Sequence, residues 1–250
     1  MRRKIVFLMV VATTLICANV SYGQNSPAPA ASGSPIDATL YTTYTIDSAH
    51  TSVTWIVCGS TQNTSGCYAS GNLGPFAKVG ALMEGNPKTD LGTNTVTRAI
   101  YVLDIASGSN LNGVVLSVYT KTDTITPDFD TVTVTLSKTV SLPLVGGSSA
   151  AASMAANNKF LFIGTNRSPQ GVELDKRTFS ITQVGGFSPP INVSAITADK
   201  YGYVTMTFGK FNDIENGFVV FGPDGGFRED GGGADFMLNT VQAVLPSTLH

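Results

Sequence analysis

The sequence predicts an all-β fold built from repeated units. The repeat is clearest in two segments, SMAANNKFLFIG at Ser153–Gly164 followed by Gly171–Leu174, and AITADKYGYVTMTFG at Ala195–Gly209 followed by Gly217–Gly222. In each, a run of small residues precedes a turn and two β-rich runs separated by glycine. From about residue 40 to residue 240, short β-branched or aromatic runs alternate with Gly, Pro, Asn and Asp, and no sustained helical period occurs. Such self-similarity indicates a repeat architecture.

The N-terminal region has the pattern of an export signal. A basic segment, Arg2–Lys4, precedes the apolar run Ile5–Ile16 and a small-residue cleavage site. We therefore expect a signal peptide at 1–23, a flexible Pro/Ala/Ser-rich leader at 24–38 and a single β-repeat domain at 39–250. The apolar run is too short to span a membrane, which needs about 18 residues. The sequence predicts a secreted protein, periplasmic or extracellular, with no membrane span.

The low content of basic residues limits the classes of partner that the protein can bind. Charged residues make up 13% of the chain, against about 25% in typical globular domains. Residues 1–23 hold three of the 15 basic residues and none of the 17 acidic ones, so the mature chain has 12 basic residues and a net charge of −5. Nucleic-acid binding requires a concentrated basic surface, and we expect no nucleic-acid partner.

Two cysteines remain after removal of the signal peptide. Cys58 and Cys67 flank the polar stretch GSTQNTSG. An even number of cysteines at short spacing in an exported chain predicts a disulfide. The alternative, a redox or metal pair, lacks both a nearby histidine and a C-x-x-C spacing.

The repeats can be aligned strand by strand. Small residues dominate the four runs expected innermost: Thr43–Asp47, Val79–Glu84, Ser153–Asn157 and Ala195–Asp199. The most apolar runs are expected second and should form the cores between units: Ser52–Cys58, Ala99–Ile105, Lys159–Gly164 and Tyr201–Phe208. Third runs follow at Cys67–Ser70, Gly113–Lys121, Gly171–Lys176 and Gly217–Gly222. Alternation typical of outer, half-buried strands marks Asp130–Leu142 and Thr178–Gln183.

The spacing of the second runs is typical of propeller blades. Their starts lie 47, 60 and 42 residues apart, close to the 40–50-residue period of such blades. In KFLFIGTNRSPQGVELDKRTFSI, Lys159–Ile181, the chain resembles β-propeller proteins of the kind that includes bacterial surface repeat proteins and sugar-lactone hydrolases. This resemblance implies a β-propeller-like fold with four short blades, or five if Phe236–Thr240 pairs with the first repeat. A β-sandwich is the alternative fold.

Four oxygen-bearing residues are candidate metal ligands. In the alignment, Asp47, Glu84, Asn157 and Asp199 occupy matching positions at the ends of the innermost runs. Oxygen side chains that converge from separate blades could bind calcium. The lactone hydrolases that the chain resembles use Glu, Asn and Asp around a central metal. The competing interpretation, which we favour, is structural: Asp and Asn stabilise turns by bonding local backbone amides.

Other candidate sites have structural explanations. His50 is favoured as a hydrogen-bonded turn residue rather than a catalytic base, because no G-x-S-x-G motif accompanies it. No catalytic residue is assigned. The acidic, glycine-rich stretch Gly222–Phe236 is expected to be a mobile hairpin loop with its turn at Pro223–Gly225, rather than a calcium site. Tyr41, Tyr44, Tyr68 and Tyr201 are expected at loops, where their rings could stack on sugars or peptides. A tyrosine near a turn is usually explained by amphipathic packing, and no site is assigned from these four.

Three classes of function fit these observations. We favour an exported, non-catalytic module that binds an envelope or extracellular glycan or protein. The second is a metal-dependent, lactonase-like hydrolase that uses the four oxygen-bearing residues. The third is a structural repeat protein of the cell surface. The scarcity of histidine, with only two in the chain, places the first class ahead of the second.

Overall fold

The computed structural model describes residues 39–60, 65–106, 113–124, 131–188, 192–209, 216–232 and 235–240. The regular elements in these residues are all β-strands, so the predicted all-β fold class is confirmed. The expected signal peptide at 1–23 and leader at 24–38 lie outside the described residues. In the described part of the chain, no helix is long and apolar enough to cross a membrane.

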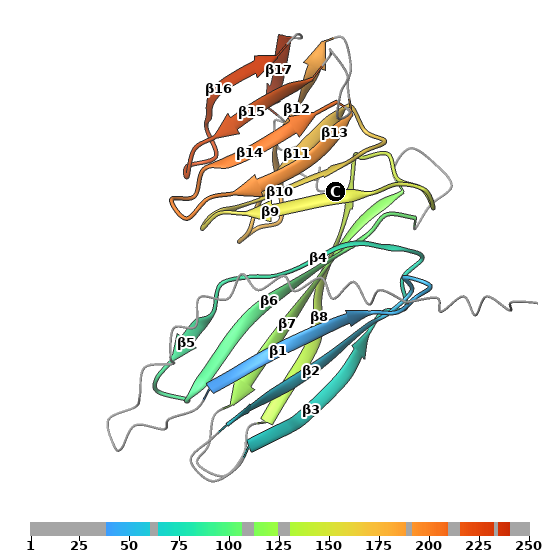
Figure 1. Cartoon of the computed structure of the whole chain (residues 1–250). Coiled ribbons are helices and arrows are strands. Elements are labelled where there is room, and N and C mark those ends of the chain that lie inside the picture. Colours follow the sequence, from blue (N-terminus) through green and yellow to red (C-terminus); the bar gives the residue numbers. More distant parts are fainter. Residues whose placement is uncertain are drawn as a thin grey trace, which may run out of the picture.

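The strands form four antiparallel sheets (Figure 1). The first sheet has the order β1 (Thr39–Ile46), β2 (Val53–Ser60), β3 (Ser65–Leu73). The second has the order β4 (Val79–Glu84), β6 (Thr95–Asp104), β7 (Val114–Thr124), β8 (Thr131–Leu142), with β5 (Lys88–Asp90) also on β6. These two sheets make up the lower half of the molecule in Figure 1.

The third and fourth sheets make up the upper half (Figure 1). The third has the order β17 (Asp235–Thr240), β12 (Ile181–Ser188), β11 (Gln170–Asp175), β10 (Phe160–Thr165), β9 (Ala152–Ala156). The fourth has the order β13 (Val193–Ala198), β14 (Val204–Phe208), β15 (Gly217–Phe221), β16 (Phe227–Gly232).

Each expected run overlaps an observed strand, and Val79–Glu84 coincides with β4. Two expectations need correction. Phe236–Thr240 falls in β17, which pairs with β12 of the third sheet rather than with the first repeat. The stretch Gly222–Phe236 is only partly a loop, because it contains β16, the outer strand of the fourth sheet. Its turn lies at Pro223–Gly225, as expected: the Gly225 amide donates to the Gly222 carbonyl at 2.9 Å.

Three apolar cores join the sheets in chain order. The first core lies between the first and second sheets and includes Trp55 and Val102. The second joins the second and third sheets, and the third joins the third and fourth. Strand β10 serves two of these cores, since Leu161 and Ile163 enter the second while Phe162 enters the third. Successive side chains of a strand point to opposite faces, so a strand buried on both faces is a nearly continuous apolar run.

The sheets at the ends of the stack have a different pattern. In β14, Val204, Met206 and Phe208 are buried in the third core, and the intervening threonines are half-buried on the outer face. The sequence VTMTF therefore alternates, whereas FLFIG in β10 does not. The difference arises because the fourth sheet packs against another sheet on one face only, whereas the third sheet packs on both faces.

The inner strands β4, β9 and β13 run in the same direction. In β13, the Ile196 amide donates to Ser153 Oγ of β9 at 2.9 Å, and beyond the ends of both strands Asn157 donates to the Gly202 carbonyl at 3.2 Å. Lys78 Nζ, just before β4, donates to the Ala150 carbonyl before β9 at 3.2 Å, and Asn86 donates to Asn158 at 3.5 Å beyond the other ends. Strand β1 runs the opposite way, because the turn that follows it lies beside the start of β4: the Val79 amide donates to the His50 carbonyl at 2.7 Å.

The predicted disulfide between Cys58 and Cys67 is present and joins β2 to β3. We expect the variant C58S/C67S to unfold with a free energy about 2–3 kcal/mol lower than the wild type, because the bond removes conformational freedom from the unfolded chain. Urea unfolding monitored by Trp55 fluorescence measures this loss. Wild-type protein in reductant should match the double variant, and equal stability with and without reductant would contradict the expectation.

Candidate functional site

The most exposed aromatic side chains of the fourth sheet lie at its turn between β13 and β14. Tyr201 is 68% exposed and Tyr203 is 42% exposed. Lys200 Nζ lies 4.9 Å from the centroid of the Tyr201 ring. A Cβ on Gly202 would approach Pro223 to 3.3 Å, so this turn contacts the turn between β15 and β16. We call Lys200, Tyr201, Tyr203 and Pro223 the tyrosine surface.

Asp199 builds the turn that carries the two tyrosines. Its Oδ1 accepts hydrogen bonds from the amides of Tyr201 at 2.8 Å and Tyr203 at 2.9 Å. Gly202 has a φ of 88°, which favours glycine, and its amide donates to the Asp199 carbonyl at 3.1 Å. Asp199 therefore acts as the turn-forming aspartate that the sequence favoured.

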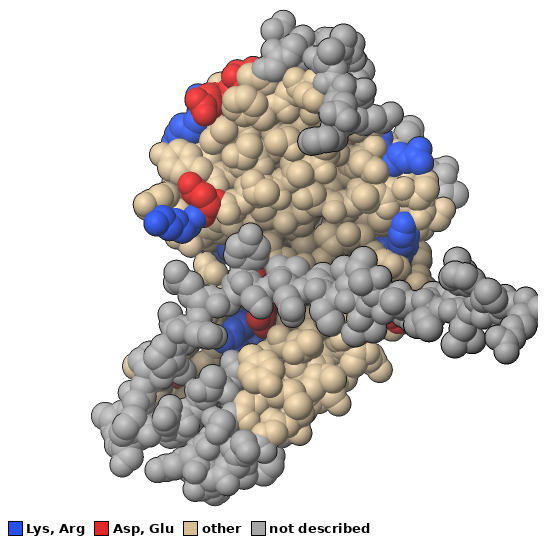
Figure 2. Space-filling view, in the orientation of Figure 1, with Lys and Arg blue, Asp and Glu red and all other residues tan. Residues whose placement is uncertain are grey.

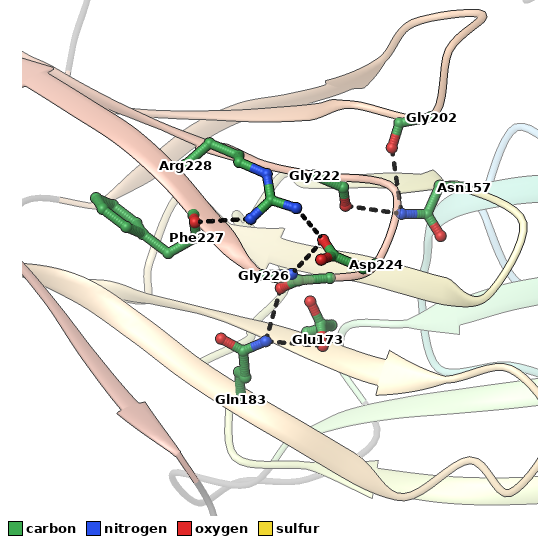
Figure 3. Close-up of polar contacts among 10 residues, drawn as sticks. Asn157, Glu173, Gln183, Gly202, Gly222, Asp224, Gly226, Phe227 and Arg228 are labelled. Atoms are coloured by element: carbon green, nitrogen blue, oxygen red, sulfur yellow. Dashed lines mark hydrogen bonds and ion pairs between the residues drawn. The ribbon is translucent and has the colours of Figure 1, made fainter.

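Asn157 fixes this turn to its neighbours (Figure 3). The side chain is buried, and its Nδ2 donates to the carbonyls of Gly202 at 3.2 Å and Gly222 at 3.4 Å. Its Oδ1 accepts from the amides of Lys159 at 2.9 Å and Phe160 at 2.8 Å. One amide group thus joins the turns β9–β10, β13–β14 and β15–β16. Asn157 therefore serves as a structural link, and its role as a metal ligand stays a prediction.

The turn between β15 and β16 is held from two sides (Figure 3). Asp224 Oδ1 accepts from Arg228 Nη2 at 2.6 Å and from the Gly226 amide at 3.1 Å. The hydrogen bond from Arg228 is the main cause that lowers the pKa of Asp224. From the third sheet, Gln183 Nε2 donates to the Gly225 carbonyl at 2.7 Å. The turn is therefore tied both to its own strand and to the neighbouring sheet.

Glu173 is buried beside this turn. Its Oε1 accepts from Thr182 Oγ1 at 2.5 Å and from Gln183 Nε2 at 3.1 Å, whereas its Oε2 has no hydrogen-bond partner among the described residues. Burial raises the pKa of this carboxyl to about 7. The adjoining cavity of about 10 Å³, lined by Phe162 and Met206 among others, holds no more than about one water molecule.

The other two predicted ligands, Asp47 and Glu84, lie in the lower half of the molecule. Asp47 accepts from the Thr51 amide at 2.6 Å and from Thr51 Oγ1 at 2.8 Å, and the latter bond is the main cause that lowers its pKa. Because β1 runs opposite to β4, Asp47 lies at the start of β4 and Glu84 at its end. The four oxygen-bearing residues therefore do not meet at one point.

Glu84 belongs to a polar network between the first and second sheets. It accepts from the Tyr44 hydroxyl at 2.9 Å and lies 3.8 Å from Lys121 Nζ. Lys121 is 1% exposed; it donates to Thr42 Oγ1 and lies 3.1 Å from Asp123, which also pairs with Arg98 at 2.9 Å. Burial, and then the negative charge of Glu84, raise the pKa of Tyr44.

No group of three or more His, Cys, Asp or Glu is placed to hold a metal ion in the described residues. Calcium binding by the four oxygen-bearing residues stays a prediction that their local hydrogen bonds do not favour. His50 lies in the turn after β1, with a φ of 60° and its Nδ1 3.3 Å from the Val79 carbonyl. That position agrees with the structural interpretation of this histidine.

The sequence did not identify the buried Lys121 and Glu173 or the half-buried Gln183 as polar residues between the sheets. A signal for two of them was available. Glu173 stands between Val172 and Leu174 in a short apolar strand, and Lys121 ends the run VVLSVYTK. A charged residue within a strand that is buried on both faces must be paired or neutralised.

A comparison with models of known protein families finds no match, and no curated protein sequence matches the chain.

We expect the stability of the wild type to fall as the pH rises, relative to Glu173→Gln. A carboxyl whose pKa rises from 4.5 to about 7 on folding contributes stability below pH 4.5 that is lost as the pH passes 7. The total loss is about 3 kcal/mol at about 1.4 kcal/mol per pKa unit. Urea unfolding from pH 4 to pH 9 measures it. Glu229→Gln, at an exposed glutamate of β16, is the control; a pH-independent difference between wild type and Glu173→Gln would contradict the expectation.

Lys121→Met should lower the free energy of unfolding by about 3 kcal/mol, because it leaves the buried Asp123 with one positive partner instead of two. Lys121→Met/Asp123→Asn should lose less than the sum of the single variants. Lys159→Met, at an exposed lysine, should have little effect. A double-mutant cycle from urea unfolding tests this coupling, and strictly additive losses would show that the two charges do not interact.

Proposed function

We propose that this protein is an exported binding module that contacts a neutral or weakly charged glycan through the tyrosine surface. The observation that carries the proposal is the pair of exposed tyrosines, Tyr201 and Tyr203, held on one turn by Asp199 and by the buried Asn157. A tyrosine ring is an apolar surface with a polar tip and loses little conformational entropy on binding. Two such rings on a fixed turn suit the alternating apolar and hydroxyl faces of sugars.

The surroundings of the tyrosine surface support an uncharged ligand. The only charged side chain within it is Lys200, which lies over the Tyr201 ring. Beside Pro223, the exposed Asp224 and Arg228 form an ion pair at 2.6 Å, so their charges offset each other. The face of the upper half drawn in Figure 2 also shows a broad area without charged side chains, with the blue and red residues at its margins. Such a surface offers little attraction to a polyanion, whose binding requires clustered basic groups.

The cavity beside Glu173 does not offer a second site for this ligand. It has a volume of about 10 Å³, whereas ligand pockets usually have several hundred Å³. The proposed glycan therefore contacts the outside of the molecule. Glu173 and Gln183 act indirectly by supporting the turn at Gly225.

We also propose that the four sheets are blades of an open, propeller-like arc. The support is that β4, β9 and β13 are the inner strands of consecutive sheets, run in the same direction and lie beside one another. The first sheet departs from this pattern, since β1 runs the opposite way. Its three strands then correspond to the outer three strands of a blade.

Export is the remaining part of the proposal. The sequence at 1–23 has the basic, apolar and small-residue segments of a signal peptide. The disulfide between Cys58 and Cys67 supports an oxidising compartment, where such bonds persist. A glycan of the cell envelope or its surroundings is the ligand class available there.

A glycan array identifies the ligand, and titration of its best neutral oligosaccharide measures the contribution of the tyrosines. Tyr201→Ala/Tyr203→Ala should weaken binding at least about tenfold, since a buried aromatic anchor contributes more than 1 kcal/mol. Tyr41→Ala is the matched control, because Tyr41 is 57% exposed on the first sheet. Unchanged affinity in Tyr201→Ala/Tyr203→Ala, or no glycan retained above the heat-denatured protein, would overturn the proposal.

A further inference from the structure

The outer strand of the second sheet, β8, is long and has a free edge. It contains 12 residues and pairs with β7; among the described strands, none pairs with its other side. An unpaired edge presents a row of backbone donors and acceptors that can bind another strand. This feature is independent of the tyrosine surface, which lies on the fourth sheet.

Most of the usual protections of a free edge are absent from the described residues of β8; its one β-bulge, at Ser137 between the pairs Val118–Lys138 and Tyr119–Leu136, lies beyond Thr131–Thr135. Natural edge strands are short, carry charges or prolines, or are covered. The outer strand of the fourth sheet, β16, follows this rule, with FRED in its six residues. The only charged residue of β8 is Lys138. Its Nζ donates to the Thr178 carbonyl at 2.8 Å and lies 5.6 Å from the Phe179 ring centroid, so this charge is directed at the third sheet instead of the edge.

The sequence of β8 is complementary to itself. Thr131, Thr133 and Thr135 are exposed, while Val132 and Val134 pack against the first core. If two copies of this segment run antiparallel about a two-fold axis at Thr133, Thr131 of one lies opposite Thr135 of the other. The same register places Val132 opposite Val134. Threonine pairs and β-branched pairs both stabilise neighbouring strands.

We propose that two copies of this protein associate edge to edge through β8, in antiparallel register about Thr133. The two second sheets then form one continuous sheet, and the valine rows of both copies extend the first core across the junction. A two-fold arrangement is closed, so the pairing uses both free edges and stops at a dimer. A dimer would also present two tyrosine surfaces, which increases the apparent affinity for a repeating ligand.

Charge complementation tests both the edge and the register. In Thr131→Lys/Thr135→Lys, each lysine faces a lysine of the second copy, and the dimer should dissociate. Thr131→Glu/Thr135→Glu should be monomeric for the same reason. An equimolar mixture of the two variants places each lysine opposite a glutamate and should restore a 1:1 dimer. All three threonines are exposed, so both variants are expected to fold, which circular dichroism checks.

Sedimentation velocity across a dilution series supplies the readout. The wild type should change from monomer to dimer as its concentration rises. Thr205→Lys, on the central strand β14, should dimerise as the wild type does. Thr43→Lys, on the uncharged edge strand β1, should also dimerise. A wild type that stays monomeric, a dimer that persists in both charged variants, loss of the dimer in Thr43→Lys, or a mixture that stays monomeric would each overturn the proposal.

Discussion

The structure depends on the burial of both faces of its two middle sheets. Leu161 and Phe162 are neighbours in the chain, yet they belong to different cores, because successive side chains of a strand point to opposite faces. Each of these side chains is 0% exposed, and burying one contributes about 1.5–3 kcal/mol. The third sheet can therefore be stable only between two others. Because the third sheet needs a neighbour on each face, it lies between the second and fourth sheets. This packing also brings the β9–β10, β13–β14 and β15–β16 turns together at one end of the sheets.

The sequence predicted the strands well because their signals are local. Runs of small residues before a turn placed the four inner runs, alternation marked the outer strand β8, and continuous apolar runs marked the middle sheets. Which strands pair with one another could not be predicted, because pairing depends on residues far apart in the sequence. The partner of Phe236–Thr240 depends on register and on space beside β12, neither of which its five residues encode. Similarly, the charged, glycine-rich FREDGG has little β propensity, and β16 forms because β15 offers it an edge.

In the candidate site, too, the local hydrogen bonds could be predicted from the sequence and the contacts between distant residues could not. That Asp47 and Asp199 build turns could be predicted, because their hydrogen-bond partners lie within five residues. Whether these aspartates meet could not, because this depends on strand direction, and β1 runs opposite to the other inner strands. The bridging role of Asn157 was also hidden, since its partners Gly202 and Gly222 lie 45 and 65 residues away. Tyr201 was recognised as exposed, but only the structure adds Tyr203 and Pro223 beside it.

Buried polar groups give the stack its specificity, because apolar faces alone are nearly interchangeable. A sheet other than the first, placed over β7, would leave the buried Lys121 without its hydrogen bond to Thr42, and an unmade hydrogen bond of a buried group costs about 1–3 kcal/mol. Between the third and fourth sheets the solution is different. Burial raises the pKa of Glu173 to about 7, and Gln183 connects this carboxyl to the Gly225 turn of the fourth sheet. The hydrogen bond from Gln183 to the Gly225 carbonyl forms only when the fourth sheet places its β15–β16 turn at this position. The same hydrogen bond therefore selects the fourth sheet as the neighbour and positions the end of that sheet that carries the tyrosine surface.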